Sequence, residues 1–305
     1  MKLSLKITSD DHAKTVKQLL KGKLHISERL IKELKFADKI LLNSIPVHVN
    51  ALVKEGDLLE ALVESEEYNE SILPEPMDLE ILYEDENLIA INKPPHMVVH
   101  PTFRHQSGTV ANGLMHHLLD RGVKTLVRPV SRLDRDTSGI ILFALNPFIQ
   151  QGLIRQMNDK TFTKEYVGLV HGIIEQDSGI IDLPIGRQEG SIMLRHVTPD
   201  GAPSVTHFKV LERFSNTTYL RFMLETGRTH QIRVHCQAAG HPLIGDTLYP
   251  LSAFESIYPD LMPRQALHSY RAIFTHPYTN KLLDLHAPIP DDIMNTLEIL
   301  RNKRI

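Results

Sequence analysis

The chain has 305 residues, a formal net charge of -3 from 34 basic and 37 acidic side chains, a hydrophobic fraction of 42% and one cysteine. These values exclude a chain that is mainly disordered, collagenous or fibrous, and a single cysteine cannot form an intrachain disulfide. Residues 1–11 lack the apolar core of a signal peptide, and no apolar run is long enough to span a bilayer. We therefore expect a cytoplasmic protein without a membrane partner.

Charge is distributed unevenly along the chain. Residues 1–39 contain ten Lys or Arg against five Asp or Glu, whereas residues 55–86 contain thirteen Asp or Glu and no basic side chain. Residues 87–305 contain 23 basic side chains against 19 acidic ones. Because a nucleic-acid backbone is bound through Lys and Arg, the two basic segments favour a nucleic-acid partner. Random clustering on a solvated surface is the alternative for the N-terminal segment.

The acidic segment has the composition of a linker. Residues 64–76 (ESEEYNESILPEP) combine charge, serine and two prolines with little periodicity. We therefore predict a small domain at 1–65, an acidic linker at 66–77 and a large domain at 78–305. We also hypothesise that the carboxylates keep the linker extended and away from RNA, which neutralising its glutamates tests through RNA affinity.

Two helices followed by strands are predicted in the small domain. A first helix covers 11–20, and Ser27 is a typical N-cap for a second helix over 28–35. Short strands follow at 40–42, 46–49 and 58–63.

This order of elements resembles the S4-like RNA-binding domain, which takes its name from a ribosomal small-subunit protein. The resemblance implies that the basic face of the two helices contacts an RNA backbone. The residues on that face are Lys17, Lys21, Arg29, Lys32 and Lys35. The alternative is a small domain that only packs in the structure and whose charged surface faces solvent without binding RNA.

The large domain alternates short apolar runs with turn residues. The runs have the length of strands at 79–83, 88–92, 139–145, 166–171 and 219–225. Helical patterns are dispersed among them at 109–119, 148–158 and 230–239. This mixture predicts an α+β domain built on a large mixed sheet.

Several motifs of cofactor chemistry are absent from the sequence. It contains no Gly-x-Gly-x-x-Gly, no phosphate-binding Gly-x-x-x-x-Gly-Lys-Ser/Thr, no Gly-x-Ser-x-Gly, no Cys pair and no His-Glu-x-x-His. We expect neither a cofactor nor a bound metal. Cys236 is interpreted as a buried, inert thiol, and histidines such as His96, His100 and His105 leave a metal-dependent phosphodiesterase as an alternative.

The densest polar segment is 131–139 (SRLDRDTSG), which leads directly into an apolar strand. Its spacing matches the first half of a calcium loop, but Leu145 stands where a bidentate glutamate is needed. What remains is Asp134 in a tight loop, where neighbouring arginines favour the ionised carboxylate. A turn or a loop salt bridge without chemistry is the alternative.

A second dense segment covers 226–235 (TGRTHQIRVH) and continues to Asp246. If a helix begins near Thr229, Ile232 and Val234 help to pack it, while Gln231 and Arg233 project elsewhere. The amides at the N-terminus of such a helix favour an anion, for example a phosphate of a substrate.

Taken together, these segments are similar to the RluA/RluD family of RNA pseudouridine synthases. The similarity is carried by RLDxxTSG at 132–139, Lys164-x-Tyr166, GRTHQIRVH at 227–235 and GHPLIGD at 240–246. Asn92-Lys93-Pro94-Pro95 and His100-Pro101 precede them in the family order, and the resemblance covers about residues 79 to 290. Ser131 departs from it, because the family usually has His before the Arg, which affects the contacts expected in this loop.

The resemblance implies a pseudouridine-synthase fold, with a large, mainly antiparallel mixed sheet flanked by helices, and an S4-like domain as a common companion. It implies that the enzyme isomerises uridine in RNA without a cofactor and that Asp134 is the catalytic carboxylate. Arg233 then pairs with Asp134, and Tyr166 stacks on the uracil, with its hydroxyl available for removal of the C5 proton. Addition to C6, attack on C1′ and abstraction of the 2′ proton all stay open as routes.

The resemblance also implies how the RNA is held. Arg132 fills the gap left by the extruded base, because its planar guanidinium can stack there. Further RNA contacts are expected from Arg135, Arg228, Thr229, His230 and Gln231. Large-subunit ribosomal RNA is the expected substrate and transfer RNA the alternative, and we expect a monomer. A non-catalytic RNA-binding factor that assists ribosome assembly is the alternative from another functional class.

Overall fold

The computed structural model describes residues 1–63, 72–103, 105–252 and 261–302. Part of the predicted linker at 66–77 therefore lies outside the described residues, and the domain boundaries stay predictions. No helix among the described residues is long and apolar enough to cross a membrane.

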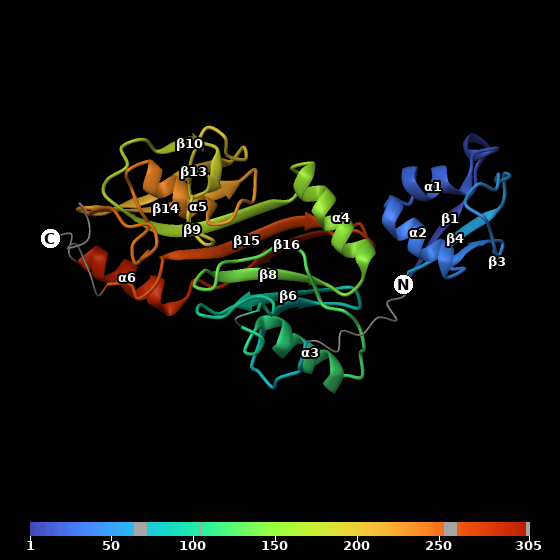
Figure 1. The fold of residues 1–305 in the computed structure, drawn as a ribbon, viewed down its shortest axis with the longest axis horizontal. Coiled ribbons are helices and arrows are strands. Elements are labelled where there is room, and N and C mark those ends of the chain that lie inside the picture. The colour runs from blue at the N-terminus through green and yellow to red at the C-terminus, as the bar shows by residue number, and fades with distance from the viewer. Residues whose placement is uncertain (64–71, 104, 253–260, 303–305) are drawn as a thin grey trace.

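The N-terminal module, residues 1–63, is a four-stranded sheet with two helices (Figure 1). The strands run in the order β1 (Lys2–Lys6), β4 (Leu58–Leu62), β2 (Ile40–Leu42) and β3 (Ile45–Pro46). The helices are α1 (Val16–Gly22) and α2 (Glu28–Phe36). The Ser27 hydroxyl accepts a hydrogen bond from the Leu30 amide and caps α2, as predicted.

Three details of this module differ from the prediction. The helix expected over 11–20 begins only at Val16, because Thr15 caps it and residues 9–11 form a 3₁₀ turn. Buried Asp11 binds Lys14 and Lys23 there, and hydrogen bonds from Lys23 and Lys14 hold the pKa of Asp11 well below its usual range. The strand expected at 46–49 extends only over 45–46, and β1, which pairs with β4, was missed.

The larger part of the chain is built on a ten-stranded sheet with the path β10-β13-β14-β9-β15-β8-β6-β5. In addition, β16 pairs with β15 and β7 pairs with β8. Among the described strands, β8 and β15 are parallel and the other pairs of this sheet are antiparallel. The α+β class with a mixed, mainly antiparallel sheet is therefore confirmed. The strands are β5 (Glu80–Glu84), β6 (Leu88–Lys93), β7 (Arg128–Pro129), β8 (Ser138–Ala144), β9 (Thr163–His171), β10 (Ser178–Asp182), β13 (Val205–Arg213), β14 (Thr217–Leu224), β15 (Leu267–Thr275) and β16 (Leu282–His286).

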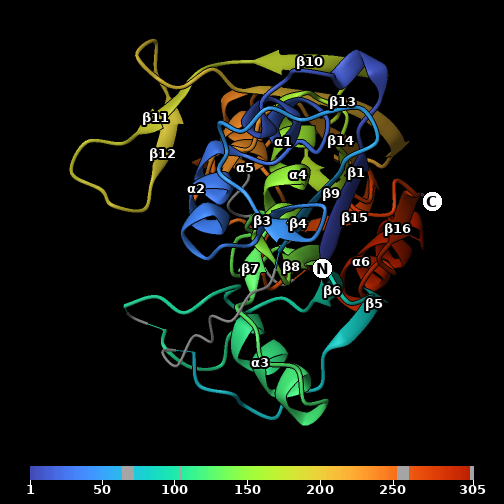
Figure 2. The same cartoon turned by 90° about the vertical axis from the view of Figure 1, so that its right-hand side faces the viewer.

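Buried residues of α4 cluster with Ile140 and Leu142 of β8, whereas those of α3 and α5 cluster with Ile141 and Phe143, so α4 packs on one face of the sheet and α3 and α5 on the other. In Figure 1, α3 is seen below β6 and α5 beside β14. The helices are α3 (Val110–Asp120), α4 (Pro147–Asn158), α5 (Gln231–Ala238) and α6 (Asp291–Asn302). A two-stranded hairpin of β11 (Ile185–Arg187) and β12 (Arg195–Val197) projects beyond the sheet (Figure 2). The polar segments identified in the sequence lie in the loops before β8 and α5.

Gly139 fixes the contact between β8 and β15, the parallel pair. It has a φ of +104°, and a Cβ at this position would lie 2.2 Å from the Ser269 carbonyl oxygen. Only glycine tolerates both the positive φ and the close backbone approach. Gly139 therefore sets the position at which the polar loop 131–137 enters the sheet.

Candidate active site

The loop at 131–137, here called the active-site loop, leads into β8 and carries Asp134. The Thr137 amide donates to the Asp134 carbonyl at 3.2 Å and closes a turn. The Asp134 side chain is 24% exposed, whereas Leu133 beside it is buried. The loop therefore anchors itself through an apolar side chain and leaves the carboxylate accessible to a substrate.

Three buried side chains donate hydrogen bonds to this loop, two to backbone carbonyls and one to the Thr137 hydroxyl. Lys93 Nζ donates to the Arg135 carbonyl at 2.8 Å, Arg264 Nη1 to the Asp136 carbonyl at 2.9 Å, and Gln265 Nε2 to the Thr137 hydroxyl at 3.3 Å. Hydrogen bonds from charged donors are among the stronger ones in proteins. The loop is therefore fixed in place before any substrate binds.

Lys93 is a fully buried lysine at the end of β6. Its Nζ donates to the carbonyls of Pro94, Met97 and Arg135 at 2.8, 2.9 and 2.8 Å. These contacts use all three N–H groups of the ammonium. Burial nevertheless lowers the pKa of Lys93 to about 7. Lys93 is a positioning residue, because all three N–H groups of its ammonium bind backbone carbonyls of the two loops that it joins.

Asp134 is paired with Arg233 of α5. Arg233 Nη1 donates to Asp134 Oδ2 at 3.1 Å, and His230 Nε2 lies 3.8 Å from Asp134 Oδ1. The structure thus brings together two of the three residues predicted to be catalytic, although they are 99 positions apart in the sequence. A guanidinium on one oxygen stabilises the ionised carboxylate and orients it.

Arg233 is itself held by a second carboxylate. Its Nε and Nη2 donate to the two oxygens of buried Asp246, both at 2.7 Å, and its guanidinium carbon lies 5.1 Å from the centre of the Tyr249 ring. Burial disfavours the charge, but the hydrogen bonds to Asp246 and the negative charges of Asp246 and Asp134 raise the pKa of Arg233 above its usual range. Arg233 therefore stays charged. Asp246 holds its Nε and Nη2 atoms, and its Nη1 is directed at Asp134.

His230 belongs to the same network. It has a positive φ of 59° and is the N-cap residue of α5. The Tyr249 hydroxyl oxygen accepts from the Arg195 amide at 3.0 Å and lies 2.7 Å from His230 Nδ1. If the Tyr249 hydroxyl donates to Nδ1, the ring proton of neutral His230 is on Nε2, the atom nearer Asp134. Burial lowers the pKa of His230, which favours this neutral form.

Tyr166, the third predicted catalytic residue, lies on β9. Its ring is 6% exposed. Burial and, to a smaller extent, the negative charge of Asp134 raise the pKa of Tyr166 to about 12, against the effect of a hydrogen bond with Ser269. The phenol is protonated at neutral pH, which suits stacking better than proton abstraction.

Ser131, the residue that departs from the family pattern, contacts Lys164 of β9. The Lys164 ammonium donates a hydrogen bond to the Ser131 hydroxyl. The first residue of the active-site loop is therefore tied to the strand that carries Tyr166.

The arginines predicted to bind RNA surround this site and are exposed. Arg132 lies in the active-site loop, Arg135 pairs with Asp136 at 3.1 Å, and Arg228 Nε donates to the Pro203 carbonyl at 3.2 Å. Thr229 is half-buried. Their RNA contacts stay predictions.

Gln231, in contrast, is not available to RNA. It is buried, and its carbonyl oxygen accepts from the Thr226 hydroxyl and the Arg228 amide at 2.9 and 3.0 Å. Its amide nitrogen donates to the Val205 carbonyl and the Thr206 hydroxyl, both at 3.0 Å. These four bonds fill the capacity of the side chain. We correct its predicted role accordingly: Gln231 joins the start of α5 to β13.

The start of α5 also differs from the prediction. The helix begins at Gln231, two residues later than the expected start near Thr229. Gln231 and Arg233 are buried together with Ile232 and Val234, so they do not project away from the core. The Gln231 amide donates to the Arg228 carbonyl at 3.1 Å, so part of the helix start is already occupied by protein groups.

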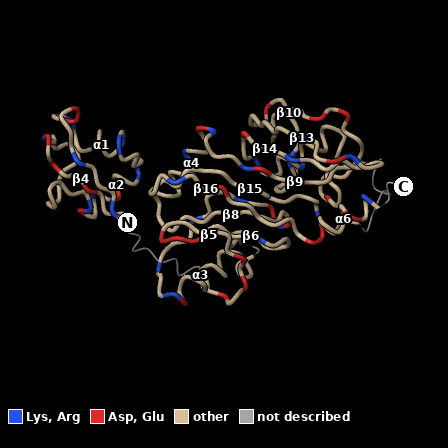
Figure 3. The backbone as a smooth tube through the Cα atoms, turned by 180° about the vertical axis from the view of Figure 1, so that it is seen from behind, with Lys and Arg blue, Asp and Glu red and all other residues tan. Residues whose placement is uncertain are grey.

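The basic residues of the N-terminal module are exposed on or near α1 and α2, and part of their charge is neutralised. Lys17 and Lys21 pair with Glu28 at 3.3 and 2.7 Å, and Arg29 pairs with Glu33 at 2.9 Å. Lys32 and Lys35 are exposed, and Lys35 lies 6.0 Å from the Phe36 ring centre. Basic and acidic residues are interspersed along the backbone in Figure 3. The five predicted RNA contacts here stay untested.

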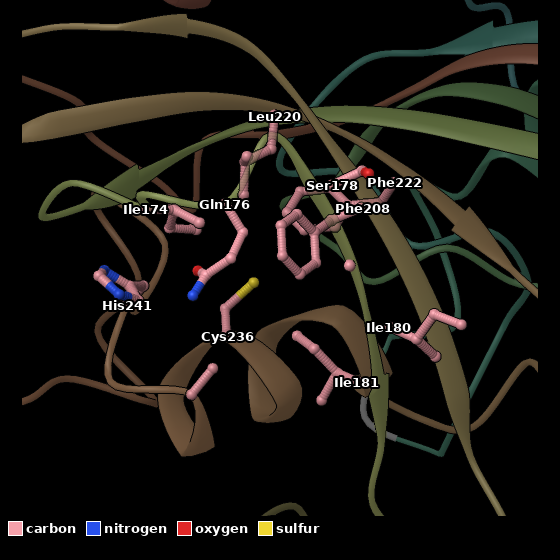
Figure 4. A pocket seen from close by; sticks show the side chains of 12 residues that line it. Ile174, Gln176, Ser178, Ile180, Ile181, Phe208, Leu220, Phe222, Cys236 and His241 are labelled. Carbon is pink, nitrogen blue, oxygen red and sulfur yellow. The ribbon is translucent and has the colours of Figure 1, made fainter.

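Cys236 lines a pocket of about 380 Å³ between α5 and the sheet (Figure 4). Its lining is mainly apolar and includes Ile174, Phe208 and Leu220, with Gln176 and His241 at the side. Burial raises the pKa of the Cys236 thiol well above its usual range, as expected of an inert thiol. Among the described residues, no group of three or more His, Cys, Asp or Glu is arranged to hold a metal ion.

Sequence reasoning did not assign roles to Lys93, Asp246, Tyr249 and Arg264. Asp246 and Lys93 stand inside segments that carried the family resemblance, so the signal was present without a function attached. Arg264 lies outside those segments. It is buried and binds Asp292 through two hydrogen bonds of 2.7 and 2.9 Å, a contact 28 positions along the chain that no local pattern marks.

Family models match both parts of the chain. The RNA pseudouridylate synthase model matches residues 87–238, and the model of the RluD ribosomal pseudouridine synthase N-terminal domain matches residues 3–59. The first match includes all three predicted catalytic residues.

Individual proteins give the same result. The chain is 44% identical over 285 residues to the uncharacterized RNA pseudouridine synthase YjbO of Bacillus subtilis (strain 168), covering 93% of this chain and 98% of that protein. It is 39% identical over 269 residues to ribosomal large subunit pseudouridine synthase D of Neisseria meningitidis serogroup A, covering 86% and 72%. The solved structure of human RNA pseudouridylate synthase domain containing 4 has a similar fold, with a TM-score of 0.59, 22% identity and coverage of 73% and 93%.

Proposed function

This chain belongs to the RNA pseudouridine synthase family and is an RNA-modifying isomerase, and we propose that Asp134 is its catalytic carboxylate. The observation that carries the proposal is the Arg233 to Asp134 hydrogen bond of 3.1 Å, supported behind Arg233 by Asp246. This arrangement keeps a carboxylate oriented and accessible in the loop that leads into β8. The same membership disfavours the non-catalytic RNA-binding factor and the metal-dependent phosphodiesterase.

The reaction conserves atoms and electrons. The N1–C1′ bond of uridine breaks, the uracil turns, a C5–C1′ bond forms, C5 loses a proton and N1 gains one. An ionised carboxylate serves each of the three routes, because it can add to C6, attack C1′ or accept the 2′ proton. In every case the hydrogen bond from Arg233 to Oδ2 of Asp134 fixes which carboxylate oxygen faces the substrate.

Tyr166 supplies a stacking surface for the uracil. Its raised pKa keeps the hydroxyl protonated at neutral pH. A protonated phenol can donate a hydrogen bond to the turning base. Its use as the acceptor of the C5 proton requires a stronger base to deprotonate it, so stacking is the role we propose first.

The uridine must leave its stack before it can reach Asp134, at a cost of a few kcal/mol. Exposed Arg132 lies two residues before the catalytic carboxylate. We place its guanidinium in the space vacated by the base, while Arg135, Arg228, Thr229 and His230 contact the neighbouring backbone.

For the substrate we propose large-subunit ribosomal RNA, with transfer RNA as the alternative. Relatives such as the Neisseria meningitidis protein are named ribosomal large subunit pseudouridine synthase D, and the N-terminal module matches the domain named after RluD. We also propose that the protein acts in the cytoplasm, where ribosomal RNA is modified, and as a monomer. Mapping pseudouridines in cellular RNA with and without the protein decides between the two RNAs.

The role of Asp134 is tested by Asp134→Asn in an assay of tritium release from RNA that contains 5-tritiated uridine. We expect steady-state release to fall below detection while the variant stays folded, so that residual activity is resolved only in single turnovers with enzyme in excess. Asp136→Asn is the matched control, because Asp136 lies on the same loop but pairs with Arg135 and His96. Substantial turnover by Asp134→Asn, or an equal loss in both variants, would remove the assignment.

A further inference from the structure

Lys164 is a half-buried cation that contacts the active-site loop and that the proposed mechanism does not use. Within β9 it stands two residues before Tyr166, and alternate residues of a strand share a face. The cross-strand partners are Ala272 for Lys164 and Ser269 for Tyr166. Strand geometry separates the two side chains by about 7 Å along that face.

The ammonium of Lys164 has few partners for its charge. Among the described residues, the Ser131 hydroxyl accepts one hydrogen bond, and the Phe162 ring centre lies 5.6 Å away. No carboxylate in the described chain forms an ion pair with it. Two of its three N–H groups therefore remain for another acceptor.

The surroundings of Lys164 suit an anion. The Ser131 hydroxyl, which accepts from Lys164, can donate its own proton to a further oxygen. The next residue, Arg132, is exposed beside it. A lysine and a hydroxyl thus meet where the active-site loop contacts β9, and an exposed arginine is the next residue of the loop.

We propose that Lys164 and Ser131 form a binding site for a backbone phosphate of the nucleotide whose uracil stacks on Tyr166. The proposal rests on the function proposed above and adds to it the group that fixes the sugar-phosphate. Lys164 binds the phosphate as a point charge, and Ser131 orients the ammonium and donates a hydrogen bond. The base is then held on Tyr166 and its backbone two residues along the same strand.

The proposal has a consequence for pH. Burial lowers the pKa of Lys164 to about 8. The charged groups on the elements around it are Arg132 and Asp134 in the loop, Glu165 and Arg271 on the opposite face of the strands, and Glu225, which pairs with Lys160. The free enzyme thus carries the Lys164 charge below about pH 8 and loses it above, so RNA binding weakens as the pH rises from 7 to 9.

The test uses three single variants of the full chain and measures kcat, KM and their salt and pH dependence with a transcript of large-subunit ribosomal RNA containing 5-tritiated uridine. Lys164→Gln removes the charge, and Lys164→Arg keeps a charge that does not titrate in this range. Lys209→Gln is the matched control. Lys209 pairs with Arg221 and Arg221 with Val167, so it lies on the opposite sheet face from Tyr166 and Lys164.

For Lys164→Gln we expect KM to rise about tenfold and the slope of log KM against log salt to fall by about 0.7, the loss of one phosphate contact, with kcat changed less than about threefold. Lys164→Arg restores KM at pH 7 and removes the rise in KM between pH 7 and 9. Lys209→Gln leaves all these values at the wild-type level.

An unchanged KM and salt slope in Lys164→Gln overturns the phosphate site. A loss of kcat in Lys164→Arg with unchanged KM also overturns it, because that result assigns Lys164 to proton transfer. The two proposals can fail separately, since the dependence of tritium release on Asp134 is measured by comparing the wild type with Asp134→Asn and does not require any of the Lys164 variants.

Discussion

The active-site loop and the N-terminal module both present charged residues, but they hold them in different ways. In the loop, Asp134 is paired with a buried Arg233 that has a second carboxylate behind it, and buried Lys93 fixes the backbone. In the N-terminal module, Lys17, Lys21 and Arg29 form exposed ion pairs with Glu28 and Glu33. Exposed pairs contribute little to stability, whereas breaking a buried pair is costly.

The difference separates two functions. A reaction needs groups fixed to within a fraction of an ångström, and buried hydrogen bonds provide that precision. Binding along an RNA backbone needs mainly positive charge, which exposed and mobile side chains supply. Substitutions in the loop network should therefore change folding or turnover, and substitutions in the N-terminal module should change affinity in a salt-dependent way.

The largest effect is expected from Gly139→Ala, which attacks the backbone contact beneath the active-site loop. The new Cβ would lie 2.2 Å from the Ser269 carbonyl oxygen at a φ of +104°. We expect the free energy of unfolding to fall by about 4 kcal/mol or more, measured by urea denaturation. Gly122→Ala is the control, because Gly122 has a φ of +74° with no atom within 4 Å. Equal losses in the two variants would show that β8 and β15 can separate without cost.

The next effect is expected from Asp246→Asn, which removes the charge behind Arg233. Asn can keep one hydrogen bond to the guanidinium but not the paired carboxylate contacts of 2.7 Å. We expect kcat to fall about 100-fold with KM changed little, because Arg233 no longer holds Asp134 in one orientation. Asp284→Asn, which breaks the exposed pair with Arg271, is the control. If KM for RNA rises while kcat stays unchanged, Asp246 acts in RNA binding instead.

The smallest effect is expected in the N-terminal module. Lys32 and Lys35 are exposed. The double variant Lys32→Ala/Lys35→Ala should weaken RNA binding several-fold and reduce the salt slope of binding by about 0.7 for each lost phosphate contact, with kcat unchanged. Filter binding at several salt concentrations measures this slope. If the slope does not change, the module's basic face does not contact RNA and the packing alternative holds.

The sequence predicted the parts of the fold whose patterns are local. Ser27 marked the start of α2, and the apolar run after Gly139 marked β8. The α+β class followed from the mixture of such patterns. In contrast, β15 was missed although it lies between β9 and β8, because His268 and Ser269 are polar and buried. His268 Nδ1 lies 2.9 Å from the Ser138 hydroxyl, a partner 130 positions away.

The site shows the same limit. Asp134, Tyr166 and Arg233 were identified because the motifs that contain them resemble those of a family. The distances among them, and the support from Asp246, Lys93 and Arg264, depend on contacts between distant segments. For Gln231 the motif led to a wrong prediction. The residue stands inside a functional motif, but its side chain donates hydrogen bonds to Val205 and Thr206 on β13 instead of facing RNA.

The most direct test of the central claim, that Arg233 acts through Asp134, is a double-mutant cycle on kcat for tritium release. The variants are Asp134→Asn, Arg233→Gln and the combination, all measured under single-turnover conditions with enzyme in excess over RNA. We predict that the combined variant loses no more activity than Asp134→Asn alone, because residues that act as one unit are strongly non-additive. Losses that add, or an Arg233→Gln variant with wild-type kcat, would contradict the account.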